Sequence, residues 1–101
     1  MRVYIAGPYS IGDPAVNVKN AMDAANQLLD AGHQPYIPHL THFLHMYHPR
    51  NISVWYELDN AWLAVSEALI RLPGVSSGAE AEVRLALKLG IPVMRLEELC
   101  E

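Results

Sequence analysis

The sequence has a single cysteine among its 101 residues and lacks several features that define common protein classes. Because Cys100 has no partner within the chain, no intramolecular disulfide can form, which favours a reducing compartment. No apolar run approaches the roughly 18 residues of a membrane-spanning helix, and no charged leader precedes the first apolar segment. We therefore expect a cytoplasmic protein without a membrane partner.

Basic residues are few and do not cluster. Seven Lys and Arg against eleven Asp and Glu give a net charge of −4. Proteins that bind nucleic acid by counterion release concentrate positive charge, so we expect no nucleic acid polymer as a partner. The composition, 51% hydrophobic and 18% charged, is that of a globular protein. At this length we expect one domain, over residues 1–101.

Short apolar runs bounded by glycine or proline predict four buried strands, at residues 2–6, 34–37, 68–72 and 91–96. A helical pattern follows the first run, with Asp13 as N-cap, Pro14 in the first turn and Gly32 just past the end. Two more helical patterns begin at Ser53, as a cap, and at Ser77. Alternating strands and helices predict an α/β fold: one three-layer domain with a mainly parallel, four- to five-stranded sheet, flavodoxin-like or Rossmann-like.

In such a fold the ligand site lies at the carboxyl ends of the strands, beside the point where the strand order reverses. This rule selects the loops at residues 7–13, 38–51 and 73–78. The first loop holds Gly7 and Pro8 in a tight turn, but both nucleotide-binding glycine fingerprints are absent. The third holds Ser76, Ser77 and Gly78, where the backbone amides of a helix N-terminus could bind a small anionic group.

A carboxylate is predicted to face inward in the first turn of the last helix. Glu80, Arg84 and Lys88 recur every four residues and form one solvated face. At about 100° per residue, Glu82 lies about 200° from Glu80, on the apolar side. Because Ser77 and Glu80 form a capping box, Glu82 is not needed for the cap. The helix N-terminus would keep Glu82 ionised, as a nucleophile requires; alternatively, Glu82 is a boundary residue that only favours the helix dipole.

A second carboxyl, Asp59, falls between Trp55 and Trp62 at helical spacing. Desolvation by these rings would raise its pKa, which suits a general acid, and two carboxyls in different environments commonly divide such roles. Alternatively, Asp59 lies at the edge of the apolar face that carries the two tryptophans and points to solvent. Tyr4, in the first strand, could place its hydroxyl beside Glu82 or could be a packed core residue.

Four histidines recur every three residues: His39, His42, His45 and His48. The spacing suggests zinc, yet on a helix it spreads the rings over roughly half the circumference. No cysteine or nearby carboxylate completes a tetrahedral set, so we do not expect a metal. The segment is instead expected to cover the site and, with Tyr47 and Phe43, to stack on a ring of the ligand. His39 is its member nearest to a strand end.

Three segments now stand out together. They are Tyr4 in Val-Tyr-Ile-Ala-Gly-Pro, Asp59 in Asp-Asn-Ala-Trp-Leu, and Ser76-Ser77-Gly78 followed by Glu82 and then Gly-Ile-Pro-Val. In order and spacing they resemble the nucleoside 2-deoxyribosyltransferase superfamily, which includes the 2′-deoxynucleoside 5′-monophosphate N-glycosidases. The resemblance extends over nearly the entire chain. One departure is the Pro8-Tyr9-Ser10 loop, which lacks the arginine that the monophosphate hydrolases place there.

This resemblance implies hydrolysis of the base–sugar bond of a nucleoside or nucleoside 5′-monophosphate by a retaining mechanism. Glu82 would attack C1′, Asp59 would assist departure of the base, and Tyr4 would orient Glu82. The resemblance also implies a homo-oligomer that needs no metal or organic cofactor. A close alternative is deoxyribosyl transfer to a second base. An alternative of another class is a non-catalytic protein that binds a nucleotide or signalling ligand in the same cleft.

Overall fold

Four parallel strands form the centre of the fold, in the order β2-β1-β3-β4. The computed structural model describes residues 1–100. Its elements are β1 (Arg2–Ala6), α1 (Pro14–Asp30), β2 (Gln34–Tyr36), a 3-10 turn η1 (Pro38–Leu40), α2 (Thr41–Tyr47), α3 (Ile52–Ala64), β3 (Ala68–Arg71), α4 (Ser77–Lys88), β4 (Val93–Met94) and α5 (Leu96–Leu99). The predicted α/β class with a parallel sheet is therefore confirmed, with four strands.

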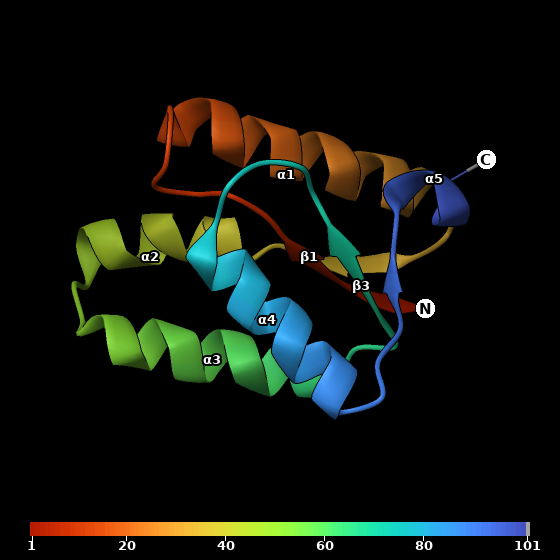
Figure 1. The fold of residues 1–101 in the computed structure, drawn as a ribbon. Helices are drawn as coiled ribbons and strands as arrows, with labels where there is room; N and C mark the ends of the chain where they lie inside the picture. The colour runs from red at the N-terminus through yellow and green to blue at the C-terminus, as the bar shows by residue number, and fades with distance from the viewer. Residues whose placement is uncertain (101) are drawn as a thin grey trace.

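Helices cover both faces of the sheet (Figure 1). Because side chains alternate along a strand, Val3 and Ile5 of β1 pack against α1, where Leu28 is fully buried. Tyr4 and Ala6 point the other way and pack in a second cluster with Leu63 of α3 and with α4. Figure 1 shows α1 and α5 on one side and α3 and α4 on the other, which is the predicted three-layer arrangement.

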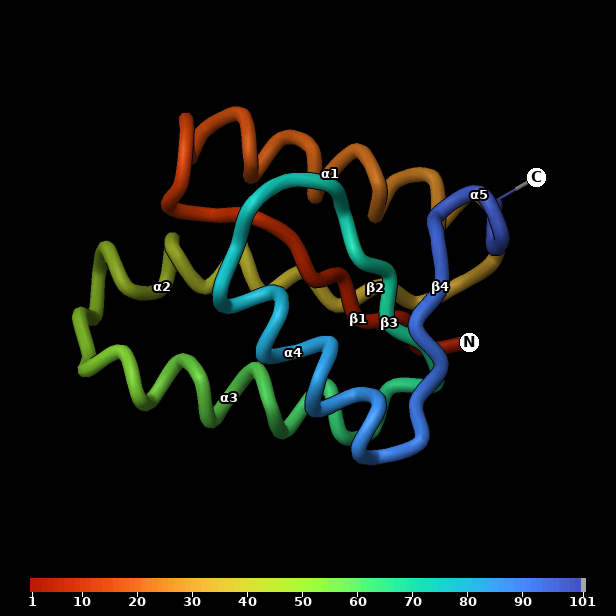
Figure 2. The backbone as a smooth tube through the Cα atoms, viewed as in Figure 1, coloured from red at the N-terminus to blue at the C-terminus, as the bar shows by residue number. Residues whose placement is uncertain are grey.

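The strand order reverses between β1 and β3. The chain places β2 on one side of β1 and then β3 and β4 on the other. The path of the backbone through these strands can be followed in Figure 2. The loops that follow β1 and β3 therefore leave the sheet side by side. They pass so closely that a Cβ on Gly7 would stand 3.0 Å from Cβ of Leu72, which explains why a glycine follows β1. The predicted ligand edge of the sheet is formed at this point.

The first helix begins and ends as predicted. The carboxylate of Asp13 accepts a hydrogen bond from the backbone N–H of Ala15, and Pro14 occupies the first turn. Gly32 follows the helix with a φ of +87°, a conformation that glycine adopts without strain.

Both other predicted caps are wrong by one or two residues. Helix α3 is capped by Asn51, whose side chain accepts from the N–H of Ser53, so Ser53 is not the cap. Helix α4 is capped by Ser76, which accepts from the N–H of Ala79, while Ser77 is its first helical residue. Several side chains in one stretch can serve as N-cap, and tertiary contacts decide which does.

The last predicted strand is much shorter than its apolar run. Only Val93 and Met94 pair with β3, because the chain turns into α5 at Leu96. Leu96 and Leu99 pack against the core cluster from this short helix, so these apolar residues are partly buried without belonging to the sheet. Within residues 1–100, no helix is both long and apolar enough to span a bilayer.

Candidate functional site

A cavity of about 810 Å³ opens at the predicted edge of the sheet. Its walls come from the loop after β1, from η1 and α2, from α3, and from the first turns of α4. Most predicted site residues line it, namely Gly7, His39, Asp59, Ser76, Ser77, Gly78 and Glu82. Tyr4 lies behind this wall, and Pro8 turns away to pack against Gly74.

The side chain of Glu82 is positioned by a hydrogen bond from Tyr4. The Tyr4 side chain is fully buried on β1, and its hydroxyl donates a hydrogen bond to Glu82 Oε2. Since α4 begins at Ser77, Glu82 lies in its second turn, where the helix dipole is weaker than in the first. Burial, opposed by the Tyr4 hydrogen bond, raises the pKa of Glu82 to about 7. The rise runs against the expectation that the helix N-terminus keeps Glu82 ionised, because burial favours the protonated form.

Asp59 is held by a second tyrosine, which the sequence reasoning did not identify. The hydroxyl of Tyr36, at the end of β2, donates to Asp59 Oδ1 at 3.1 Å. Burial raises the pKa of Asp59 to about 6, and the hydrogen bond from Tyr36 limits the rise. Trp62, expected to desolvate Asp59, is half-exposed and lies against the ring of Tyr36 instead.

The two tyrosines form a pair. Tyr4 and Tyr36 are direct partners in the register of β1 and β2, so their side chains leave the sheet on the same face. Their rings are stacked with centroids 5.5 Å apart. The two cavity carboxyls are thus held by adjacent hydroxyls, and the charge of Asp59 also raises the pKa of Glu82. The protonation of Glu82 therefore depends on that of Asp59.

His39 joins two walls of the cavity. Its ring is buried, and Nε2 lies 2.9 Å from the carbonyl oxygen of Pro8. A carbonyl oxygen can only accept, so His39 donates its Nε2–H, and burial lowers the pKa of this imidazole. His39 Nδ1 is buried and has no hydrogen-bond partner among residues 1–100. His39 lines the cavity, as predicted for a site residue, while its ring N–H ties η1 to the loop after β1.

Two other histidines of the series, His42 and His45, lie in the outer wall of the cavity. His48 does not line it, and neither do Phe43 and Tyr47, which were expected to cover the site and stack on a ring. His42 contacts the hydroxyl of Tyr9 through Nδ1, which links α2 to the loop after β1. His45 Nδ1 accepts from Nε1–H of Trp55 at 2.8 Å, which links α2 to α3. Within the described residues, no group of three or more His, Cys, Asp or Glu side chains could hold a metal ion.

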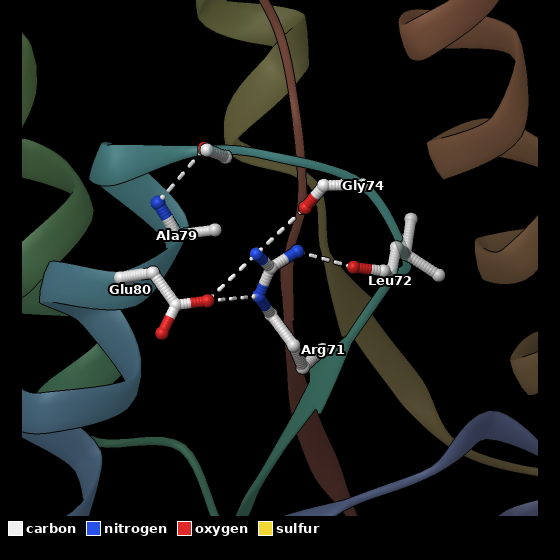
Figure 3. Close-up of polar contacts among 6 residues, drawn as sticks. Arg71, Leu72, Gly74, Ala79 and Glu80 are labelled. Atoms are coloured by element: carbon white, nitrogen blue, oxygen red, sulfur yellow. Dashed lines mark hydrogen bonds and ion pairs between the residues drawn. The ribbon is translucent and has the colours of Figure 1, made fainter.

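Arg71 organises the loop that leads to the cavity (Figure 3). From the end of β3 its guanidinium donates to the carbonyl oxygens of Leu72 and of Gly74, the latter at 2.9 Å. It also pairs with Glu80 Oε1 at 2.8 Å, so Glu80 is used here and not in the predicted capping box with Ser77. The positive charge of Arg71 also partly offsets the rise in the pKa of Glu82.

The comparisons with known proteins agree with this fold. No curated protein matches the chain in sequence. Among solved structures, the chain is similar to a 2-deoxyribosyltransferase from the psychrotolerant bacterium Bacillus psychrosaccharolyticus, with a TM-score of 0.75 and 19% identity over 94% of this chain and 71% of that chain. That enzyme is described as a biocatalyst for the synthesis of antiviral and antitumoral nucleosides. At this identity the likeness supports the resemblance noted in the sequence at the level of the fold.

The model of one family covers almost the whole chain. It matches residues 1–96, which include β1, the cavity and β4. The chain therefore belongs to the family described as "Domain of unknown function (DUF7768)".

Proposed function

We propose that this protein hydrolyses the N-glycosidic bond of a nucleoside or nucleoside 5′-monophosphate, with Glu82 as nucleophile and Asp59 as general acid. The observation that carries the proposal is the pair of carboxyls in one cavity, each held by the hydroxyl of a buried or half-buried tyrosine. Retaining glycosidases use such a pair in divided roles. The fold shared with a 2-deoxyribosyltransferase supports a nucleoside as the substrate class.

The reaction proceeds in two displacements. A carboxylate oxygen of Glu82 forms a bond to C1′ as the bond from C1′ to the base nitrogen breaks. The electron pair of that bond passes to the base, and Asp59 supplies the proton that neutralises it. A water molecule then attacks C1′ of the ester, Asp59 takes a proton from that water, and Glu82 leaves as the carboxylate. Tyr4 orients Glu82 and stabilises its charge in both steps.

The protonation of the pair suits this chemistry around pH 6 to 7. The pKa values of Asp59 and Glu82, raised by burial to about 6 and about 7, leave close to one proton on the two groups in this range. The reactive form carries that proton on Asp59 and the charge on Glu82. Because the pKa of Glu82 lies above that of Asp59, this form is the less populated of the two singly protonated forms, and the hydrogen bond from Tyr4 raises its share by lowering the pKa of Glu82. Activity therefore falls both when the pair gains a second proton and when it loses the first.

The cavity fits a ligand of this size. Its volume of about 810 Å³ lies within the usual range of small-molecule sites, roughly 300–1,000 Å³. Tyr9 and Trp55 contribute aromatic rings to the outer wall, on which a base could stack. The Ser76 hydroxyl and the amides of Ser77 and Gly78 line the other side and are our candidates for binding a 5′-phosphate.

The decisive experiment is product analysis. The parent protein and Glu82→Gln would be incubated with nucleosides and 5′-monophosphates in ribo and deoxy forms, and free base would be measured by chromatography. We expect base release from the parent and a loss of at least about a thousandfold in the variant. Glu57→Gln, an exposed carboxyl on α3, is the matched control and should retain full activity. A parent that releases no base from any member would contradict the proposal.

Two alternatives give different results in the same assay. Because the similar solved structure is a transferase, a free second base should be added: formation of the exchanged nucleoside would assign deoxyribosyl transfer. A non-catalytic binder would release nothing, and Glu82→Gln would retain ligand affinity in calorimetry.

We also propose that the protein forms a homo-oligomer. Large apolar side chains are half-exposed along α2 and α3 and at the residue after α3, including Phe43, Met46, Trp62 and Val65. Apolar surface of this kind is typical of interfaces between subunits. Sedimentation velocity should give a mass at least twice that of the 11.2 kDa chain; a monomer at micromolar concentration would contradict this.

A further inference from the structure

Tyr36 contacts Asp59 from behind the cavity. The hydroxyl of Tyr36 lies 3.1 Å from Asp59 Oδ1, and Tyr36 is not among the residues that line the cavity. Tyr36 ends β2 and Asp59 lies in α3, so this hydrogen bond ties the helix to the edge of the sheet. A ligand in the cavity would therefore meet Asp59 but not Tyr36.

The ring of Tyr36 is held on both sides. It stacks on Tyr4 at 5.5 Å with an interplanar angle of 30°, and on Trp62 at 5.9 Å with an angle of 21°. Trp62 follows Asp59 by three residues on α3, so both side chains project from neighbouring positions of that helix. The helix that carries the carboxyl also supplies a ring that restrains the tyrosine, and the hydroxyl has little freedom to leave Asp59.

We propose that Tyr36 is a positioning residue that holds the carboxyl of Asp59 in one orientation and, through the stack on Tyr4, relates it to Glu82. The inference rests on the proposed function for its catalytic consequence, since Asp59 is the general acid there. Tyr36 acts on the reaction only through Asp59. Its loss should affect proton donation and leave ligand binding largely intact.

The variant Tyr36→Phe removes the hydroxyl and keeps the stacked ring. With the substrate that the parent cleaves, we expect kcat to fall about tenfold or more while KM changes less than about twofold, because misorientation of an acid affects the chemical step. The acid limb of the profile of kcat/KM against pH, which lies near the pKa of Asp59, should move up by up to about one unit, because Asp59 loses a hydrogen bond that favours its charged form. A general loss of packing would lower activity without moving this limb.

A double-variant cycle tests whether Tyr36 acts through Asp59. Adding Tyr36→Phe to Asp59→Asn should cause no further loss beyond about twofold, whereas independent roles would multiply the two losses and overturn the inference. Tyr47→Phe, with an exposed ring outside the cavity, is the matched control and should match the parent.

A measurement that needs no turnover separates this inference from the proposed function. Titration of the Asp59 carboxyl by ¹³C NMR in aspartate-labelled protein would be compared between the parent and Tyr36→Phe. An upward shift of about one unit supports the assignment even if the parent releases no base, in which case only the proposed function fails. An unchanged titration overturns the assignment even if the parent is active.

Discussion

Pro8 and Gly74 interlock across the two loops beside the cavity. Gly74 has a φ of +116°, and a Cβ at this position would stand 2.7 Å from Cγ of Pro8. Both the backbone conformation and the space therefore require glycine. This contact, together with that between Gly7 and Leu72, fixes the loop after β1 against the loop after β3.

A substitution at Gly74 should destabilise the protein through two effects. Gly74→Ala adds backbone strain at positive φ and a clash with the rigid ring of Pro8, which together should cost about 2–4 kcal/mol of unfolding free energy. Gly12→Ala is the control, because Gly12 has a φ of +83° but nothing within 4 Å of the added Cβ. Gly12→Ala should lower the free energy of unfolding by about 1 kcal/mol, which is the contribution of backbone strain alone. Equal melting temperatures for the two variants would refute the clash.

The charge of Glu82 should make stability depend on pH in a defined window. The pKa of Glu82 is raised from its ordinary 4.5 to about 7, so the stability it contributes is complete below pH 4.5 and is lost as the pH rises through 7. Glu82→Gln removes this titration. Near pH 8 the variant should be more stable than the parent, by on the order of 2 kcal/mol, and near pH 4.5 the two should be nearly equal. Urea denaturation at both pH values measures this; a difference that grows on acidification would contradict the burial argument.

Ser76 and Ser77 should differ in their effect on α4. Ser76→Ala removes the hydroxyl that accepts from the N–H of Ala79 and should lower stability by about 1 kcal/mol. Ser77→Ala, at the first helical position, should change stability by less than about 0.5 kcal/mol. Thermal unfolding of the two variants compares them directly. A larger loss of stability in Ser77→Ala than in Ser76→Ala would identify Ser77 as the N-cap.

Arg71 should matter more for the hydrogen bonds that shape the loop beside the cavity than for its positive charge. Arg71→Lys keeps a cation but cannot donate at once to Leu72, Gly74 and Glu80, so base release should fall about tenfold or more. Glu80→Gln should have a much smaller effect, because its carboxylate is mostly exposed and such pairs contribute little. If base release fell equally in Arg71→Lys and Glu80→Gln, the effect would be assigned to the ion pair between Arg71 and Glu80 alone.

The fold and most of the cavity lining could be predicted from the sequence, because strand spacing and the helical position of Glu82 depend on local pattern. The caps at Asn51 and Ser76 could not, because several adjacent side chains are able to cap. Tyr36 was missed because its link to Asp59 depends on the register between β1 and β2, which joins residues distant in sequence. The raised pKa of Glu82 could not be predicted, because it follows from burial by parts of the chain that are distant in sequence.

The register of the edge strand β2 determines whether Tyr36 can contact Asp59. Only three residues pair, and the central one, Pro35, offers no N–H to the ladder. A slip of one residue would turn Tyr36 toward α1 and away from Asp59 while leaving the strand still paired. A chain with this slipped register would keep nearly native secondary structure, but the carboxyl of Asp59 would lose its hydrogen bond from Tyr36 and would be misoriented. Circular dichroism would not detect such molecules, and only an assay of turnover per folded molecule would count them.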